Sequence, residues 1–225
     1  MNPLLALNQR DQFVWLDHIS RSLITGGVLH RLIEQDSLGG VTSNPTIFDK
    51  AIAGSTDYDS ELRRLLDAER NIGDRALVER LIVDDIQLAA DVLRPVYDHS
   101  DGANGFVSLE VSPDSAHDTG ATVAEARHLW QVVARPNVMI KVPATQAGVR
   151  AVEMLTADGI NVNITLMFSL EHYEGRGPGL PSRHSAPPGA PSSDIRCVCI
   201  CQSTRRSRGP PAREDRFARR AFFAG

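Results

Sequence analysis

Residues 137–145 read NVMIKVPAT, and this stretch decides the fold that the sequence predicts. Its centre, residues 138–142, is a short apolar run followed by a threonine that can start a helix, as expected of a buried parallel strand. Similar short segments occur elsewhere in the chain, and turn residues such as DGANG and DGIN stand beside some of them. These segments span residues 13–16, 40–42, 105–109 and 162–166.

Longer amphipathic stretches lie between the short segments. Residues 74–97 repeat apolar side chains every 3.6 positions, which predicts a long helix that Asp74 caps. Further helices are predicted over residues 145–155, after Pro45, and from a capping box made by Thr122 and Glu125. This alternation of short strands and helices is typical of an α/β fold with a parallel sheet.

Polar side chains close several of these strands, which favours a barrel over an open sheet. In a (β/α)8 TIM barrel, the carboxyl ends of the strands meet around one pocket. Because the sequence shows about five βα units where a barrel needs eight, we predict a partial barrel over residues 1–174.

The composition changes abruptly after Glu174. Residues 1–174 hold 14 basic and 25 acidic side chains, whereas residues 175–225 hold 10 arginines, 3 acids and all three cysteines. This second part is rich in Pro and Gly, and its only apolar run is IRCVCICQ, so we predict a disordered tail. The absence of cysteine from the first part fits a chain that folds in the cytosol.

Lys141 is the sharpest chemical feature, because the chain has only one other lysine, Lys50, against 22 arginines. Burial on a parallel strand favours the neutral amine that attacks carbonyl groups. The alternative is a lysine whose ammonium group extends to solvent at the strand end. The residues around Lys141, taken alone, leave both interpretations open.

Other strand ends carry further candidates for the same pocket. Each also has a simpler interpretation: Asp17 can cap a helix, and Asn44 can form the turn before Pro45. Glu110 is harder to explain in this way, since unpaired acids are seldom buried. The candidates are Asp17, Asn44, Glu110, Asn163 and Thr165. The histidines lack metal-ligand spacing, and no zinc, P-loop or dinucleotide motif is present.

Four motifs, in this order, carry a resemblance to a known family. They are VTSNPTIF (41–48), SLEVSP (108–113), NVMIKVPAT (137–145) and GINVNITLMFS (159–169). Together they resemble transaldolase, in particular its longer bacterial type, over residues 3–174. Fructose-6-phosphate aldolase-like proteins share the NP and lysine motifs but differ around the fifth strand.

The resemblance implies a sugar-phosphate transferase of the pentose phosphate pathway that needs no cofactor or metal. Lys141 would form a Schiff base with a ketose phosphate, and Asp17 would take the C4 hydroxyl proton. Glu110 and Thr165 would handle the water of Schiff-base formation. The residues implied to bind substrate are Asn44, Asn163 and Phe168. The expected reaction converts sedoheptulose 7-phosphate and glyceraldehyde 3-phosphate to erythrose 4-phosphate and fructose 6-phosphate.

The sequence departs from the family after Glu174, where three further βα units are expected. We interpret residues 175–225 as the product of a reading-frame shift. A family segment VDTAV, encoded as GTC GAC ACG GCG GTC, reads Ser-Thr-Arg-Arg-Ser one base out of phase, as in residues 203–207. We therefore expect this chain to be inactive as a transaldolase.

Two other functions stay open at this point: a non-catalytic remnant of a transaldolase, and a nucleic-acid-binding module that uses the basic tail. The second has little support, because C-x-C-x-C is not a usual zinc spacing and arginines alone are poor evidence for base stacking. We expect no nucleic-acid partner, no membrane segment and no export signal, hence a cytoplasmic protein. The oligomeric state stays open.

Overall fold

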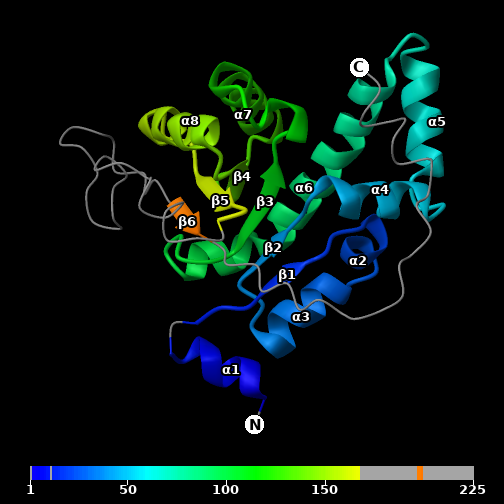
Figure 1. Ribbon diagram of the computed structural model, residues 1–225. Helices are drawn as coiled ribbons and strands as arrows, with labels where there is room; N and C mark the ends of the chain where they lie inside the picture. Colours follow the sequence, from blue (N-terminus) through cyan, green and yellow to red (C-terminus); the bar gives the residue numbers. More distant parts are fainter. Residues whose placement is uncertain (1, 11, 168–196, 200–225) are drawn as a thin grey trace, which may run out of the picture.

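The computed structural model describes residues 2–10, 12–167 and 197–199. Figure 1 shows helices and strands that alternate along the chain. The helices are α1 (Pro3–Asn8), α2 (Arg21–Thr25), α3 (Val28–Asp36), α4 (Pro45–Ala53), α5 (Asp59–Ala68), α6 (Asp74–His99), the 3₁₀ helix η1 (Pro113–Ser115), α7 (Thr119–Val133) and α8 (Gln146–Ala157). The strands are β1 (Trp15–Asp17), β2 (Gly40–Thr42), β3 (Phe106–Glu110), β4 (Val138–Pro143), β5 (Val162–Thr165) and β6 (Cys197–Cys199). None of the helices in the described ranges is both long and apolar enough to cross a membrane.

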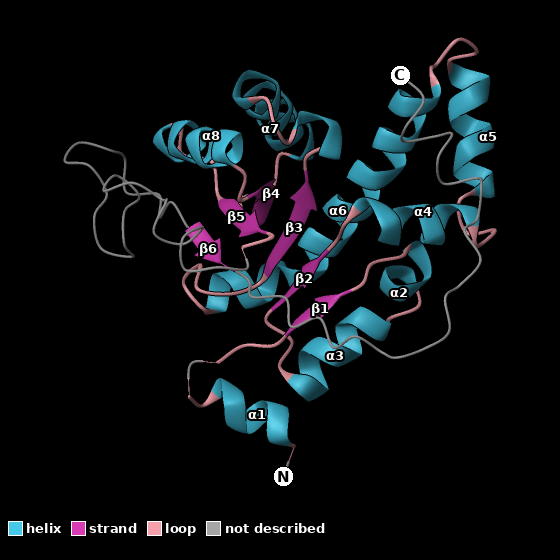
Figure 2. Cartoon of the chain, viewed as in Figure 1, coloured by secondary structure: helices cyan, strands magenta, loops and turns pink. Residues whose placement is uncertain are grey.

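The strands form one parallel sheet in which each strand pairs with the next along the chain, from β1 to β6. Helices α6, α7 and α8 pack against β3, β4 and β5 (Figure 2). Sequential parallel strands with helical crossovers on one side are the arrangement of a β/α barrel. The predicted α/β class with a partial barrel is therefore confirmed.

The two faces of the sheet differ, because successive side chains of a strand point to opposite sides. Val107, Ile140 and Ile164 lie on the outer face and are buried in the main hydrophobic core. Helix residues such as Ala89, Leu129 and Val152 belong to the same core. The inner face carries the alternate residues, which include most of the polar side chains of the strands.

The five predicted strands are confirmed, with ends that differ by up to two residues. The first strand spans Trp15–Asp17 and not residues 13–16. The fifth ends at Thr165, because Leu166 has a φ of 60°, a left-handed conformation that breaks an extended strand.

The predicted caps of two helices are wrong. Gly73 occupies the cap position of α6, and Asp74 lies in the first turn, where its charge favours the helix N-terminus. Helix α7 begins before Thr122, because the Asp118 side chain accepts a hydrogen bond from the backbone nitrogen of Ala121 at 3.0 Å. The apolar period placed both helices correctly, but several nearby residues were able to serve as caps.

Residues 197–199 form β6, which pairs in parallel with β5 so that Cys197 lies opposite Val162. These three residues are the only part of the predicted tail after Glu174 that the structure describes, and the expected disorder of the tail stays a prediction. They come from the run IRCVCICQ, and the edge of β5 offers backbone groups that an extended segment can satisfy. The rest of the predicted tail lies outside the described residues.

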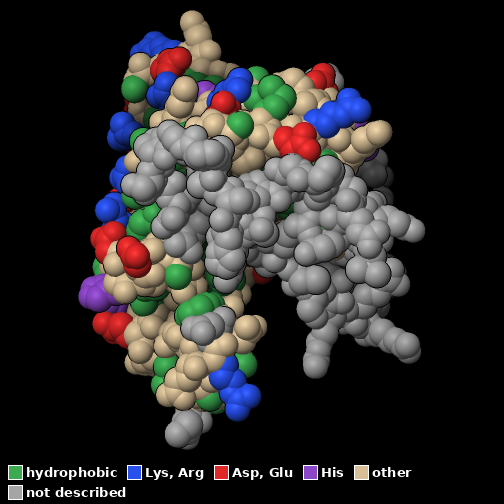
Figure 3. Space-filling view, turned by 90° about the vertical axis from the view of Figure 1, so that its left-hand side faces the viewer, with side chains coloured by type: hydrophobic (Ala, Val, Ile, Leu, Met, Phe, Trp, Pro, Cys, Tyr) green, Lys and Arg blue, Asp and Glu red, His purple; other side chains and the backbone are tan. Residues whose placement is uncertain are grey.

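Charged side chains on the surface are mixed in sign. On the face seen in Figure 3, Lys and Arg side chains stand among Asp and Glu side chains in the part that the structure describes. Ion pairs on the surface of the described part of the chain include Arg135 with Asp91 at 2.6 Å and Arg127 with Asp158 at 2.7 Å. Exposed pairs of this kind contribute about 0–1 kcal/mol each.

Candidate active site

Lys141 lies on β4, all of whose residues are buried, and only 3% of its side chain is exposed. Its Nζ donates a hydrogen bond to the backbone oxygen of Ser43 at 3.0 Å and lies 3.4 Å from Oε2 of Glu110. The ammonium group therefore stays inside the barrel and does not extend to solvent at the strand end. A buried amine next to one carboxylate is an arrangement suited to attack on a carbonyl group.

Glu110 closes β3 and pairs in register with Lys141. Burial raises the pKa of the Glu110 carboxyl, and the nearby Lys141 charge opposes part of that rise. The negative charge of Asp17 raises the pKa of Glu110 further. A carboxyl group with a raised pKa can both take and return a proton closer to neutral pH than an ordinary glutamate.

Asn163 extends the same row, because it pairs in register with Lys141 from the other side. Its Nδ2 donates a hydrogen bond to Oγ of Ser108 at 2.9 Å. Its Oδ1 is buried and has no hydrogen-bond partner among the described residues, and the same holds for Oγ1 of Thr42. Two buried polar atoms without a hydrogen-bond partner among the described residues therefore lie at this row: Oδ1 of Asn163 within it, and Oγ1 of Thr42 on the same face of the sheet.

Asp17 and Thr165 close the strands at the two sides of this row. Asp17 is exposed at the end of β1 and pairs in register with Thr42. Thr165 is 4% exposed at the end of β5, in register with Pro143. Both residues therefore lie at the carboxyl edge of the sheet, together with Lys141.

Asn44 caps helix α4: its Oδ1 accepts a hydrogen bond from the backbone nitrogen of Ile47 at 3.0 Å. Pro45 follows in the first turn, as the sequence predicts. The oxygen of the Asn44 side chain is thus engaged in the helix cap, so any contact with a ligand would use its amide nitrogen.

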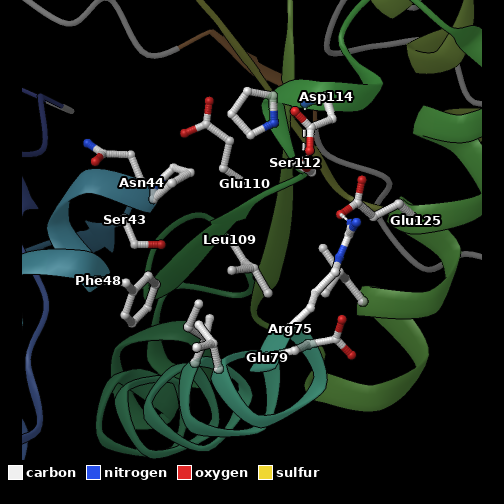
Figure 4. A pocket seen from close by; sticks show the side chains of 15 residues that line it. Ser43, Asn44, Phe48, Arg75, Glu79, Leu109, Glu110, Ser112, Asp114 and Glu125 are labelled. Carbon is white, nitrogen blue, oxygen red and sulfur yellow. Dashed lines mark hydrogen bonds and ion pairs between the residues drawn. The ribbon is translucent and has the colours of Figure 1, made fainter. Parts of the chain in front are cut away.

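A cavity of about 110 Å³ adjoins the lysine site from the side of Glu110. Figure 4 shows Asn44 and Glu110 at one end and Arg75, Glu79 and Glu125 at the other. Apolar side chains line the space between them, among them Phe48, Ile82, Leu109 and Leu129. Glu110 therefore borders both the inner face of the sheet and a groove over helices α6 and α7.

Two contacts of the site, one to a backbone oxygen and one to a side-chain hydroxyl group, were not predicted. Ser43 holds Lys141 through its carbonyl oxygen, and Ser108 holds Asn163 through its hydroxyl group. Ser108 lies two residues before Glu110, so a period of two already puts both on one face. Phe168, expected to bind substrate, lies outside the described residues. Within the described ranges, no group of three or more His, Cys, Asp or Glu side chains is placed to hold a metal ion.

Comparison with known proteins shows which family this sequence matches. A model of the Transaldolase/Fructose-6-phosphate aldolase family matches residues 14–175. The chain is 52% identical over 172 residues to a transaldolase of Thermobifida fusca, covering 76% of this chain and 46% of the relative. It is 46% identical over 173 residues to Transaldolase 2 of a Nostoc species, covering 77% of this chain and 45% of the relative. The chain thus spans less than half the length of these relatives.

Proposed function

Because the chain belongs to the transaldolase/fructose-6-phosphate aldolase family, we propose that it carries the Schiff-base part of a transaldolase, with Lys141 as the nucleophile. The observation that supports this role most directly is the buried amine of Lys141, 3.4 Å from the carboxylate of Glu110. The relatives are longer proteins, so the complete transfer reaction, its sugar-phosphate substrates and its place in the pentose phosphate pathway are parts of this proposal. So is a cytoplasmic location.

The first step joins the lysine to the ketose. The lone pair of Nζ on Lys141 adds to the C2 carbonyl carbon, and the carbonyl oxygen takes a proton to give a carbinolamine. Loss of that hydroxyl group as water leaves an iminium ion. Glu110 borders Lys141 and has a raised pKa, so it can take the proton from nitrogen and deliver one to the departing hydroxyl group. Thr165 would help to hold this water.

The second step breaks a carbon–carbon bond. Asp17 takes the proton from the C4 hydroxyl group, the C4 oxygen forms a carbonyl, and the electrons of the C3–C4 bond move into the iminium ion. An aldose phosphate leaves, and a three-carbon enamine stays on Lys141. The enamine then adds to a second aldose phosphate, and hydrolysis frees Lys141.

Binding residues would keep the sugar in place during these steps. The amide of Asn163 lies beside Lys141, and Asn44 borders Glu110 in the adjoining cavity. Hydrogen bonds from these amides to the sugar hydroxyls would fix the C2 carbon for attack. Phe168 is proposed to contact the substrate from the segment after β5.

Trapping the covalent intermediate tests this function. Borohydride added with fructose 6-phosphate is expected to leave a dihydroxyacetone adduct on Lys141, detected by peptide mass spectrometry. Lys141→Arg should abolish the adduct, whereas Lys50→Arg should leave it unchanged, since Lys50 is exposed on α4. An adduct on Lys50 alone would refute the assignment. An adduct of the intact six-carbon sugar on Lys141, without the three-carbon adduct, would identify a remnant that keeps only the first step.

A further inference from the structure

Ser43 is a fully buried residue between the end of β2 and the cap of α4. Its Oγ donates a 2.8 Å hydrogen bond to the backbone oxygen of Ser108 on β3, and its backbone nitrogen donates to the same oxygen at 3.3 Å. A carbonyl oxygen only accepts hydrogen bonds, so the hydroxyl group of Ser43 is the donor. Two bonds to one atom of β3 therefore fix Ser43 on the side of the strand.

The peptide group between Ser43 and Asn44 is fixed from its other end as well. Asn44 caps α4, because its Oδ1 accepts a 3.0 Å hydrogen bond from the backbone nitrogen of Ile47. The carbonyl oxygen of this peptide group accepts a 3.0 Å hydrogen bond from Nζ of Lys141 on β4. The acceptor that meets the lysine is thus set by the Ser43 hydroxyl group on one side and by the helix cap on the other.

Nζ of Lys141 has two neighbouring acceptors that differ in chemistry. The carbonyl oxygen of Ser43 lies at 3.0 Å and Oε2 of Glu110 at 3.4 Å. In the proposed reaction Glu110 gains and loses a proton, so its contact with the nitrogen changes from step to step. A backbone carbonyl oxygen stays an acceptor throughout. Ser43 therefore supplies the constant contact.

That contact matters most in the iminium ion, because its nitrogen keeps a single N–H group. When this N–H is held, the plane of the C=N bond cannot turn about the bond between Cε and Nζ. One face of the iminium carbon then always points to the same part of the site. When the N–H is not held, the plane can turn and present either face.

We propose that Ser43 is a positioning residue, whose hydroxyl group holds its own carbonyl oxygen in place to accept the N–H of the iminium ion on Lys141. This contact sets the face at which the iminium carbon is attacked. The inference rests on the proposed role of Lys141 and deepens it, because it names a group that orients the intermediate and takes no part in proton transfer.

Reductive labelling of the 225-residue chain with hydroxyacetone tests the proposal. Nζ adds to the ketone carbon, water leaves, and hydride from cyanoborohydride reduces the iminium ion to a secondary amine with a new stereocentre. The two diastereomers formed on Lys141, and those formed on Lys50, are separated by chromatography against synthetic standards. Lys141 is expected to give one of them in about fivefold excess, the ratio that one ordinary hydrogen bond can produce. Lys50, which is exposed on α4, should give nearly equal amounts.

Variants of Ser43 test whether its hydroxyl group is the cause. Ser43→Ala should still be labelled at Lys141, but with a diastereomer ratio close to that at Lys50. Ser43→Thr, which keeps the hydroxyl group, should keep the ratio of the unmodified chain. Ser43→Cys, which places a much weaker donor in a similar space, gives the same comparison if the alanine variant does not fold.

Ser115→Ala is the matched control, because Oγ of Ser115 also donates a 2.8 Å hydrogen bond to a backbone oxygen, that of Ser112. It should lower the melting temperature about as much as Ser43→Ala does and leave the ratio at Lys141 unchanged. The inference is wrong, and the Schiff-base role stands, if Ser43→Ala keeps the ratio, if Ser115→Ala loses it equally, or if Lys141 and Lys50 give equal ratios in the unmodified chain. If hydroxyacetone does not label Lys141 at all, both fail.

Discussion

At the scale of single residues, the site depends on opposed effects at one carboxyl group. Burial raises the pKa of Glu110, the charge of Lys141 lowers it, and burial is the larger effect. A carboxylate that must act as a base loses this ability as the pH falls through its pKa. The raised pKa therefore moves that loss to a higher pH than the ordinary glutamate value of about 4.3.

We predict that Glu110→Gln slows the borohydride-trapped labelling of Lys141 by roughly 10²- to 10⁴-fold, the usual contribution of a positioned acid–base group. In the unmodified chain the labelling rate should decline as the pH falls through the raised pKa of Glu110, and the variant should lack this decline. The matched control is Glu79→Gln, at the opposite end of the same cavity. Equal pH profiles for Glu110→Gln and the unmodified chain would contradict the assignment.

The sequence indicates which residues are candidates for this site, but it does not indicate the contacts between them. Lys141, Glu110 and Asn163 were predicted because a buried lysine is costly and polar side chains at parallel strand ends meet. The roles of Ser43 and Ser108 depend on a backbone oxygen and on a bond between two strands that are not neighbours. Contacts of that kind need the register of the strands, which residue types alone do not reveal.

At the scale of elements, the helix after β4 is fitted closely to the strand that carries Lys141. Gly148 lies in the first turn of α8, where an added Cβ would come 2.0 Å from the backbone oxygen of Pro143, the last residue of β4. The close atom belongs to the backbone and not to a flexible side chain, so the first turn of α8 or the end of β4 would have to move.

We predict that Gly148→Ala destabilises the chain by about 1–3 kcal/mol, as overpacking usually does, and also slows labelling of Lys141. Gly120→Ala is the matched control in the first turn of α7, where the nearest atom is a side-chain oxygen 3.4 Å away. This control should keep or raise stability, because alanine favours helices over glycine by up to about 1 kcal/mol. Urea unfolding measures both, and equal midpoints would show that the contact relaxes freely.

A second element-scale feature is a buried charge in the middle of α6. Asp85 is fully buried, forms an ion pair with Arg21 at the start of α2, and accepts a 2.6 Å hydrogen bond from the hydroxyl group of Tyr58. The same hydroxyl group accepts from the backbone nitrogen of Arg21 at 3.1 Å. Burial raises the pKa of Asp85, and its two partners offset part of the rise. The cluster therefore joins α2, α6 and the start of α5.

We predict that Asp85→Ala lowers the free energy of unfolding by about 3–5 kcal/mol, because it leaves the Arg21 charge without its buried partner. Asp91→Ala on the exposed side of α6 removes a surface pair with Arg135 and should cost about 1 kcal/mol or less. Urea titrations of the two variants give the comparison. Similar losses for both would mean that Asp85 is not buried as described.

Helix positions were predictable from the apolar period, but this cluster was not. Asp85 stands between Leu81 and Ala89 on the buried side of α6, where the pattern calls for an apolar residue. The sequence shows that an acid interrupts the apolar pattern, but it does not show which residues pair with that acid. Its partners, Arg21 and Tyr58, are distant in the chain. The caps show the same limit at short range, since Asp118 and Thr122 are both good cap residues and only the structure shows that Asp118 is the cap of α7.

At the scale of the whole molecule, the division at Glu174 stays a prediction that rests on composition and on the family match, which ends at residue 175. The sequence of the gene tests it directly. A one-base correction near codon 175 should restore a transaldolase-like continuation. If no such correction does so, residues 175–225 are not a frameshifted segment.

The last prediction concerns the edges of the sheet. A parallel barrel leaves no edge, because its last strand pairs with its first. Among the described residues, β1 pairs only with β2, and β6 pairs only with β5. Neither Trp15–Asp17 nor Cys197–Cys199 contains the lysine or proline that commonly protects an exposed edge.

We therefore predict that the 225-residue chain self-associates through these edges at micromolar to millimolar concentrations, melts with low cooperativity and shows no transaldolase turnover. Light scattering over a dilution series should give a mass that rises with concentration, and circular dichroism should show a broad thermal transition. The physical reason is that backbone groups at an open edge find partners in a second chain when their own sheet supplies none. A preparation that stays monomeric over that range, melts cooperatively and transfers dihydroxyacetone units between sugar phosphates would show instead that the edges are closed.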